Sequence, residues 1–349
     1  MVTIKDIAQE AGVAVSTVSR VINCHPDVSL ATKQKVQEVI DRRHFVPKSN
    51  AKQLKQQNST IISIFVKGRF NFLFHPILEK IQHLIEAKGY TGVVNYLDEE
   101  SNEVHESSIV CNEKKSLGVM FLGGNPKNFQ NDFSKISIPG ILVTSSGEDF
   151  GYENLSSVTT DDYKAARSAI SYLIKMGHEK IGIIGGKYEM SNMSEIRLRG
   201  AVDELEKYGI LFDETLQYEM ARYSLEGAYE AAQRLLIKNP ELTAIFAMSD
   251  VMAIGAMRAI ADKGLSIPED ISIIGFDGID LANYYNPKLT TIRQLQDELA
   301  KNSVDILLRQ IEKNDKPLHK VLSFELLEGH SVKEISRVNE NNAKFEKTS

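Results

Sequence analysis

The sequence predicts an α/β protein whose body is built from doubly wound parallel sheets and is preceded by a small all-α head. Two observations support this fold class. From Ile61 onward, short apolar stretches of strand length alternate with amphipathic helical stretches, which is the pattern of parallel sheets. Before that point, from Thr3 to His44, apolar residues follow helical spacing. At 349 residues the chain is also too long for one compact core, so two or three domains are expected.

The head begins with two short predicted helices joined by a glycine. Thr3 can cap the first helix, and Asp6, three residues later, completes a capping box. Gly12 ends that helix, because glycine adopts the left-handed conformation at little cost. The second helix is expected from about Val15 to Asn23. Two helices joined by a tight turn are the pattern of a helix-turn-helix.

The second of these helices has one apolar and one polar face. The apolar set is Val18, Val21 and Ile22. Short polar side chains and one arginine on the other face can reach base edges and phosphates in the major groove of DNA. An ordinary helical hairpin with a solvated polar face would show the same spacing. The polar face consists of Ser16, Thr17, Ser19, Arg20 and Asn23.

A third helix should complete the head. Ser29 is its expected cap, and the helix is predicted from Leu30 to about His44. Its apolar residues would close a three-helix core; they are Val36, Val39 and Ile40.

The charge of the chain is unevenly distributed. Residues 1–57 hold nine Lys/Arg and five Asp/Glu, a net charge of +4, whereas the rest of the chain carries −10. Residues 46–58 are polar and basic, as in a linker. A basic head on an acidic body suits a chain whose end alone meets phosphate.

The body shows two strand–helix patterns in series, the second starting near residues 158–162. The expected strands are Ile61–Val66, Gly92–Tyr96, Gly118–Leu122, Gly140–Val143, Lys180–Ile184, Leu216–Glu219, Ala244–Ala247 and Ile271–Gly275. The expected helices are Pro76–Lys88, Tyr163–Met176, Met193–Tyr208, Leu225–Ile237 and Ala253–Lys263. Two such units leave a cleft between them, and open parallel sheets bind ligands beyond the carboxyl ends of their strands.

Polar residues that follow the strands are therefore candidates for ligand contacts. Asp277 follows the last predicted strand, and Ser249 and Asp250 follow the strand before it. Arg197 lies early in the helix after the Gly185-Gly186 loop. A carboxylate and a guanidinium hold hydroxyl groups well, because charge strengthens hydrogen bonds. Alternatively, Asp277 could cap a helix, and Arg197 could be an ordinary arginine on the protein surface. The apolar floor of a pocket, or ordinary core, would be formed by Phe72, Leu73 and Phe276.

Several function classes lack support in the sequence. No nucleophile, base and oxyanion set is visible, so no catalytic residue is assigned and an enzyme is not expected. Gly185-Gly186-Lys187 lacks the spacing of a phosphate-binding loop. Cys24 and Cys111 have no metal-ligand spacing, so neither a metal nor a cofactor is expected. No apolar run reaches the length of a membrane span and no signal peptide is visible, so a cytoplasmic protein is expected.

The motif T-I-K-D-I-A-x-x-A-G-V-x-x-x-T-V-S-R-V-I-N at residues 3–23 resembles the head of the lactose/galactose repressor (LacI/GalR) family of bacterial transcription regulators. The similarity continues at Pro47 and at Ala51 to Leu54. It resumes in the body at Asp250, in I-P-E-D-I-S-I-I-G-F-D at residues 267–277, and in L-T-T-I at residues 289–292. It covers about residues 2–330.

The resemblance implies a division into four parts. Residues 1–46 would form the helix-turn-helix DNA-binding domain and residues 47–58 a hinge helix. Residues 59–331 would form an effector-binding and dimerisation body of two periplasmic-binding-protein-like lobes, followed by a polar tail at 332–349. The N-lobe would hold residues 59–161 and 293–322, and the C-lobe residues 162–292 and 323–331. In the family, the hinge leucine wedges into the minor groove and kinks the operator, and Leu54 takes that place.

The resemblance further implies a repressor of a carbohydrate-utilisation operon that binds palindromic operator DNA as a homodimer. A sugar or phosphosugar in the cleft would change its operator affinity. Val15 and Ser16 would meet base edges, and Arg20 a guanine or a phosphate. The other candidate DNA contacts are Thr3, Thr17, Ser19, Asn23, Ser29, Thr32, Asn50, Ala51, Leu54 and Lys55. The candidate effector contacts are Phe72, Leu73, Arg197, Arg222, Ser249, Asp250, Phe276 and Asp277.

The chain departs from the family pattern, which leaves alternatives open. Ala14 stands where serine is usual, Ser249 where asparagine often binds effector, and Gly278 where a second aspartate is common. Arg222 or Tyr223 falls near a family aromatic residue that stacks on the ligand. The alternative is a regulator driven by a corepressor or partner protein, of the catabolite-control or purine-repressor type. A solute-binding protein or an enzyme on this scaffold are further rivals. The tail lacks a leucine heptad, so a tetramer built through it is not expected.

Overall fold

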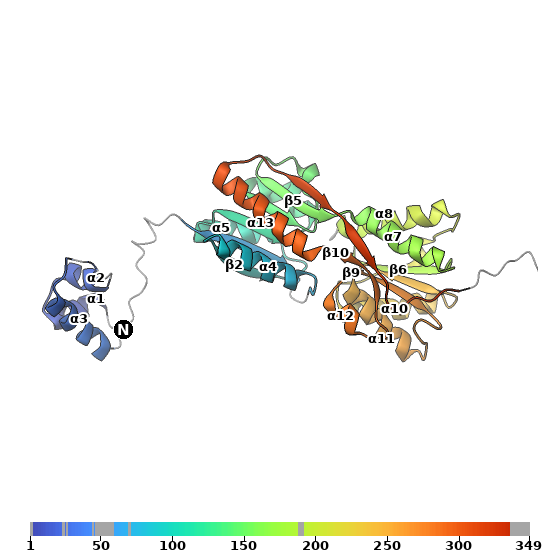
Figure 1. The fold of residues 1–349 in the computed structure, drawn as a ribbon, viewed down its shortest axis with the longest axis horizontal. Coiled ribbons are helices and arrows are strands. Elements are labelled where there is room, and N and C mark those ends of the chain that lie inside the picture. The colour runs from blue at the N-terminus through green and yellow to red at the C-terminus, as the bar shows by residue number, and fades with distance from the viewer. Residues whose placement is uncertain are drawn as a thin grey trace, which may run out of the picture. The chain divides into compact units, whose positions relative to one another are not determined.

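The computed structural model describes residues 3–22, 25, 27–43, 45, 59–68, 71–187 and 192–335. The chain divides into two compact units, the head within Met1–Ser59 and the body within Thr60–Ser349 (Figure 1).

The described part of the head contains three helices, α1 (Ile4–Ala11), α2 (Val15–Ile22) and α3 (Leu30–Arg42). The predicted capping box of α1 is present. The backbone nitrogen of Thr3 donates to the Asp6 carboxylate at 2.8 Å, and the Thr3 hydroxyl oxygen accepts from the Asp6 backbone nitrogen. The first helix therefore begins where the sequence predicts.

The ends of the other head elements also follow their residue types. Gly12 has a φ of 62°, the left-handed conformation expected where α1 ends. The Ser29 side chain accepts from the Thr32 backbone nitrogen, which caps α3. Helix α3 ends at Arg42, two residues before the predicted end. The buried core is Ile7, Ala8, Ala11, Val18, Val21, Val36, Val39 and Ile40.

The body contains two sheets, each of six strands among the described residues. The first sheet, with its helices, is called the N-lobe and has the strand order β11-β5-β4-β3-β1-β2. All its paired neighbours are parallel. Its strands are β1 (Ile61–Lys67), β2 (Thr91–Leu97), β3 (Gly118–Leu122), β4 (Gly140–Val143), β5 (Leu155–Thr160) and β11 (His319–Leu322).

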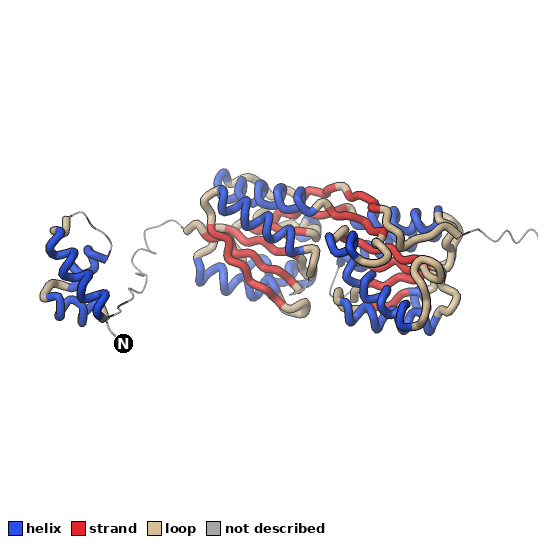
Figure 2. Tube along the Cα trace, turned by 60° about the horizontal axis from the view of Figure 1, so that its bottom comes forward, coloured by secondary structure: helices blue, strands red, loops and turns tan. Residues whose placement is uncertain are grey.

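Helices cover both faces of the N-lobe sheet (Figure 2). Apolar residues of α4 (Phe74–Ala87) and α13 (Gln296–Lys313) pack on one face. Those of α5 (Glu103–Lys114) and α6 (Pro126–Asp132) pack on the other, where phenylalanines dominate the core. Two short 3-10 turns, Phe133–Lys135 and Glu148–Phe150, belong to the same lobe.

The second sheet, with its helices, is called the C-lobe and has the strand order β12-β10-β9-β8-β6-β7. Its strands are β6 (Ile181–Gly185), β7 (Tyr218–Met220), β8 (Ala244–Ala247), β9 (Ser272–Asp277), β10 (Thr290–Gln294) and β12 (Phe324–Leu327). Helices α7 and α8 lie on one side of this sheet, and α10 and α11 on the other (Figure 1). The helices are α7 (Asp162–Lys175), α8 (Asn192–Lys207), α9 (Glu214–Gln217), α10 (Leu225–Lys238), α11 (Asp250–Asp262) and α12 (Asp280–Tyr284).

The chain passes between the two lobes three times within the described body. It crosses after β5, after β10, and between β11 and β12. Each lobe is therefore assembled from separate stretches of sequence, and the three crossings form the connection between them.

The structure differs from the predicted elements at several points. Helix α11 begins at Asp250, three residues earlier than predicted, because Ser249 caps it. Strand β9 continues to Asp277, so this residue ends a strand instead of following one. Strands β5, β10, β11 and β12 were not predicted. Strand β12 pairs with β10 in the antiparallel direction, so the sheets are not wholly parallel. No helix in the described ranges is both long and apolar enough to cross a membrane.

Candidate functional site

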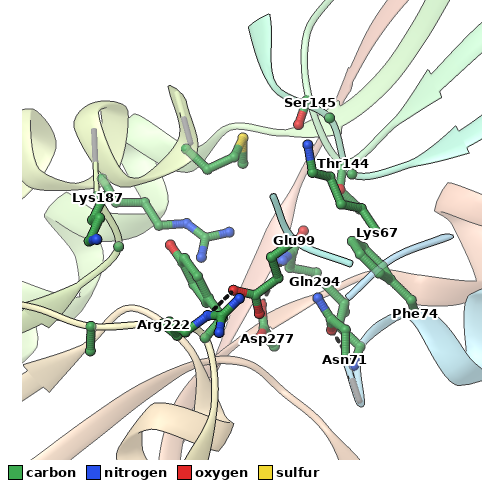
Figure 3. Close-up of a pocket in the computed structure, with 18 of the residues that line it drawn as sticks. Lys67, Asn71, Phe74, Glu99, Thr144, Ser145, Lys187, Arg222, Asp277 and Gln294 are labelled. Atoms are coloured by element: carbon green, nitrogen blue, oxygen red, sulfur yellow. Dashed lines mark hydrogen bonds and ion pairs between the residues drawn. The ribbon is translucent and has the colours of Figure 1, made fainter. Parts of the chain in front are cut away.

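A cavity lies between the N-lobe and the C-lobe (Figure 3). Its volume is about 190 Å³, large enough to hold several water molecules or a small ligand. The N-lobe lines it with Lys67, Asn71, Leu73, Phe74, Glu99, Glu100, Gly123, Gly124, Thr144 and Ser145. The other lining residues are Gly186, Lys187, Met193, Arg197, Ala221, Arg222, Tyr223, Asp277 and Gln294.

Parallel-strand geometry explains why these residues meet. Lys67 ends β1, Thr144 follows β4 directly, and Gly186 follows β6 directly. Asp277 ends β9 and Gln294 ends β10. The carboxyl ends of parallel strands lie at one edge of a sheet, and here both edges face the same cavity. The location that the strand pattern predicts for a ligand site is thus the location of the cavity.

Arg197 lines the cavity, is largely buried, and is held in place by two hydrogen bonds. Its Nε donates to Asp162 Oδ1 at 2.8 Å, and its Nη1 donates to the Met248 carbonyl oxygen at 2.6 Å. The guanidinium carbon lies 3.7 Å from the centroid of the Phe276 ring. Burial raises the pKa of Asp162, and the Arg197 charge opposes this rise. Arg197 is therefore part of a buried ion pair and not a surface arginine.

Asp277 is the carboxylate that faces the cavity from the C-lobe. It accepts a hydrogen bond of 2.8 Å from Gln294 Nε2. Burial raises the pKa of Asp277 to about 7, against the opposing effects of the Arg197 charge and the Gln294 hydrogen bond. Its φ is 119°, a conformation that costs energy for a residue with a side chain and that often occurs at functional sites. Asp277 does not cap α12, whose cap position is held by Ile279.

Gln294 also connects the two lobes. Its Oε1 accepts from the Thr160 hydroxyl at 2.9 Å, while its Nε2 donates to Asp277. All three side chains are buried. The carboxylate in the cavity is thus linked by hydrogen bonds to the strand β5 at the first crossing.

A hydroxyl pair shapes the wall near β6. The hydroxyl oxygens of Ser194 and Tyr223 lie 2.8 Å apart, and the Gly186 backbone nitrogen donates to Ser194 Oγ at 3.1 Å. A Cβ atom at Gly186 would lie 2.5 Å from the Ser194 oxygen and 2.6 Å from the Tyr223 ring. Only glycine leaves room for this arrangement.

Three further cations line the cavity, Lys67, Lys187 and Arg222, and the structure pairs Lys67 and Arg222 with carboxylates. Lys67 Nζ lies 2.6 Å from Glu103 Oε2, and both side chains are largely buried. Arg222, on the loop after β7, extends toward the loop after β2. Its guanidinium lies 3.4 Å from Asp98, 3.5 Å from Glu99 and 3.7 Å from Glu100. Figure 3 shows Arg222 and Glu99 meeting between the two lobes.

Of the eight candidate effector contacts, four line the cavity and four do not. Leu73, Arg197, Arg222 and Asp277 belong to the lining. Phe276 is fully buried with its ring against the Arg197 guanidinium, and it does not belong to the lining. Phe72 is 42% exposed and lies in a separate groove beside α4 and α12.

Ser249 and Asp250 are occupied elsewhere. The Ser249 hydroxyl accepts from the Met252 backbone nitrogen and caps α11. The Asp250 carboxylate accepts from the Ile279 backbone nitrogen at 2.8 Å and from the Thr291 hydroxyl at 2.5 Å. Burial, followed by the charge of Asp277, raises the pKa of Asp250 well above its usual value. Both residues therefore hold the C-lobe together and lie outside the cavity lining.

Several polar residues of the lining were not predicted from the sequence. All of them except Gln294 follow strands that were located correctly, so the rule that selected Asp277 would also have found residues after β1, β2 and β4 had it been applied to the first half of the body. Gln294 ends β10, a strand that was not predicted. The missed residues are Lys67, Asn71, Glu99, Glu100, Thr144, Ser145 and Gln294.

The candidate DNA-contacting residues of α2 lie on its outer face. Val15, Ser16 and Arg20 are exposed, and Thr17 and Ser19 are partly buried. Thr3 is exposed, and its hydroxyl donates to the Asp6 carboxylate at 2.7 Å. The oxygens of Ser29 and Thr32 lie 2.8 Å apart. The candidates Asn23, Asn50, Ala51, Leu54 and Lys55 lie outside the described residues.

Comparison with known families matches both units of the chain. The family described as bacterial regulatory proteins, lacI family, matches residues 3–48. The family described as a periplasmic binding protein-like domain matches residues 170–332.

The similarity extends over nearly the whole chain. The HTH-type transcriptional regulator MalR of Clostridium butyricum is 40% identical over 332 residues, which cover 94% of this chain and 98% of MalR. The HTH-type transcriptional repressor PurR of Vibrio atlanticus is 30% identical, over 93% of this chain and 96% of PurR. Relatives of this length and identity share the complete arrangement of head and body.

Solved structures show the same fold. The lac repressor dimer bound to operator and the anti-inducer ONPF matches with a TM-score of 0.70 at 24% identity, covering 95% of this chain and 99% of that one. A LacI family regulator from Enterococcus faecium with bound ribose matches with a TM-score of 0.68 at 25% identity, over 79% of this chain and all of the other. The predicted fold class and the predicted resemblance are confirmed. The chain belongs to the LacI family of bacterial transcriptional regulators, which are DNA-binding proteins and not enzymes.

Proposed function

We propose that this protein represses a carbohydrate-utilisation operon and that a small sugar-like effector in the cavity changes its affinity for operator DNA. The observation that carries the proposal is a cavity between two lobes in which hydroxyl, amide and carboxylate groups converge. Structures that share the fold hold cellobiose, in the transcriptional regulator CelR, and ribose, in the Enterococcus faecium regulator. A site of this kind suits a ligand rich in hydroxyl groups.

Each part of the lining has a role in this proposal. Asp277 accepts hydrogen bonds from ligand hydroxyls, and Arg197, held in place by Asp162, donates to them. Asn71 and Ser145 offer polar contacts from the N-lobe. The aromatic rings of Phe74 and Tyr223 offer flat apolar surfaces for the faces of a sugar ring.

We further propose that the head binds a palindromic operator as part of a homodimer. Val15 and Ser16 contact base edges, and Arg20 contacts a guanine or a phosphate. The exposure of these three side chains supports the assignment. The remaining candidate contacts are Thr3, Thr17, Ser19, Asn23, Ser29, Thr32, Asn50, Ala51, Leu54 and Lys55.

An effector that touches both lobes changes their relative orientation, because its binding energy depends on how the lobes close. The N-lobe strand β1 begins at Ile61, directly after the proposed hinge at residues 47–58 in the sequence. Closure is therefore coupled to operator affinity through that segment. An effector that lowers operator affinity indicates an induced repressor, and one that raises operator affinity indicates a repressor that needs a corepressor.

The test combines ligand screening with operator binding on the full chain. A sugar panel is screened by thermal unfolding, where a ligand at about 100 times its dissociation constant stabilises by about 2.7 kcal/mol. Operator affinity is then measured with and without the sugar that binds. Arg197→Met should abolish ligand binding and Leu54→Ala should weaken only operator binding. A sugar that binds the body yet leaves operator affinity unchanged would contradict the coupling.

A further inference from the structure

We propose that the cavity selects uncharged ligands, and that an acidic loop at its mouth is the element that rejects anions. The loop consists of Asp98, Glu99 and Glu100, between β2 and α5, and is called the mouth loop. The inference rests on the proposed effector function and narrows it, because both neutral sugars and phosphosugars fit the general proposal.

The cations inside the cavity already have carboxylate partners. Arg197 is 4% exposed and donates to Asp162 at 2.8 Å. Lys67 lies 2.6 Å from Glu103, which is 1% exposed and which also accepts from the Asn128 side chain. An anionic ligand could use either cation only by competing with a carboxylate that is fixed and buried. These groups can still donate remaining N–H bonds to a neutral hydroxyl.

The mouth carries an excess of negative charge. The guanidinium of Arg222 lies within 4 Å of three carboxylates, those of the mouth loop. Exposed ion pairs of this kind are weak one by one, but one cation cannot neutralise three carboxylates. Arg222 is thereby drawn toward the N-lobe and is not free to receive a phosphate.

The cavity as a whole also has more carboxylates than cations. Its lining contains four cations, Lys67, Lys187, Arg197 and Arg222. Six carboxylates line the cavity or lie within 4 Å of those cations: the mouth loop, Glu103, Asp162 and Asp277. Within the described residues, Lys187 is the lining cation for which the structure gives no carboxylate partner. A single exposed lysine does not reverse this balance.

Uncharged groups fill the gaps between these pairs. Asn71, Thr144, Ser145 and Gln294 line the cavity and offer amide and hydroxyl groups. They match the alternating donors and acceptors of a sugar, and none of them gives a phosphate or carboxylate an advantage over a hydroxyl.

The experiment measures binding of matched neutral and charged sugars to the full chain by calorimetry. The probes are ribose with ribose 5-phosphate, glucose with glucose 6-phosphate and glucuronate, and cellobiose with cellobionate. We expect at least one neutral sugar to bind, and its charged counterpart to bind at least tenfold more weakly. The difference should shrink as salt is added, because salt screens exposed charges.

A charge-neutralised mouth loop tests the cause. The triple variant Asp98→Asn, Glu99→Gln, Glu100→Gln should reduce the preference for the neutral sugar by about tenfold, since it also frees Arg222. The matched control is Glu148→Gln, Asp149→Asn, Glu153→Gln, which changes the net charge equally at exposed positions outside the cavity lining. This control should leave the preference unchanged.

The outcomes separate the two proposals. Equal or tighter binding of a charged counterpart to the natural protein overturns the charge selection and leaves the effector function standing. The same holds if the mouth-loop variant and the control behave alike. Failure of every sugar, neutral and charged, to bind overturns the effector function and the selection with it.

Discussion

The outer face of α2 and the cavity of the body use polar side chains in opposite ways. On α2, Ser16 and Arg20 stand exposed on a helix that a small apolar core holds in place. In the cavity, Arg197, Asp277 and Gln294 are buried and already joined to neighbours. Exposed polar side chains on α2 can be replaced without loss of stability, whereas replacing a buried, hydrogen-bonded side chain of the cavity changes the stability of the body. We therefore expect substitutions of exposed residues on α2 to change operator binding without changing stability. Substitutions of buried residues in the cavity should change both ligand binding and the stability of the body.

The largest effect is expected where the head core itself is broken. Ile7→Ala removes a fully buried side chain from a core of eight residues and should cost about 2–5 kcal/mol, enough to unfold so small a unit. Operator binding should be lost while the thermal transition of the body stays unchanged, as followed by circular dichroism and calorimetry. The control Val15→Ala, at an exposed position, should weaken operator binding with the head still folded. An Ile7→Ala head that stays folded and binds operator normally would contradict the comparison.

The next effect concerns the buried ion pair. Asp162→Asn leaves the Arg197 guanidinium buried without its partner and should destabilise the body by about 3–5 kcal/mol. Urea unfolding at pH 8 measures this. It should also lower the pKa of Asp277, because the Asp162 charge contributes to raising it. The control is Asp305→Asn, which breaks an exposed pair with Arg309 and should cost about 0–1 kcal/mol. Similar losses in the two variants would show that burial of the pair does not matter.

Asp277→Asn should improve stability while impairing binding. The pKa of Asp277 is about 7 in the folded chain against 3.8 as the ordinary value. Between these pH values the folded state keeps a proton that the unfolded state has lost. The stability that the Asp277 proton contributes is therefore fully present below about pH 4 and is lost as the pH rises through 7.

The variant lacks this loss, so its advantage over the natural protein should grow between about pH 4 and pH 7, be complete above pH 7 and reach a few kcal/mol at most. Effector binding should become weaker in the variant, and in the natural protein it should weaken as the pH falls below 7, because the carboxylate is the better acceptor. Unfolding and calorimetric titrations at pH 4.5 and pH 8 check both expectations. A variant that is less stable at pH 8 would contradict the assigned burial.

The smallest effect is expected from a helix cap in the head. Ser29→Ala removes the hydroxyl that caps α3 and should cost about 0.5–2 kcal/mol, seen as a lower melting temperature of the head. Ser29→Asn keeps the capping ability and should restore most of this stability. If the asparagine variant is stable but binds operator poorly, Ser29 also contacts DNA. The matched change in the body, Ser224→Ala at the cap of α10, should cost a similar amount without touching operator binding.

Local sequence signals predicted the head almost completely. The capping box, Gly12 and Ser29 act over three or four residues, so their roles are visible in the sequence alone. The central strands of the body were predicted for the same reason, because each is a compact apolar run. Arg197 and Asp277 were found because each follows such a strand or its loop.

The pairing within the cavity was not predictable in this way. Arg222 meets Asp98 across 124 residues, and Thr160 meets Gln294 across 134. No period or cap connects such pairs; they result from how the two sheets face each other. Ser249 and Asp250 illustrate the converse error. Both follow a strand, but α11 begins immediately, so its first turn uses the side chains that would otherwise face a ligand.

The three crossings between the lobes have a consequence for the order in which the chain is made. The ribosome releases residues 60–160 first, yet the N-lobe sheet still lacks its edge strand β11 and the covering helix α13 at that stage. Strands β6 to β10 then emerge in one continuous stretch and can pair before β11 and α13 have been synthesised. The C-lobe is therefore nearly complete while the N-lobe waits with an apolar face uncovered. A chain truncated near residue 295 would contain a nearly complete C-lobe attached to an unfinished N-lobe that is prone to aggregate.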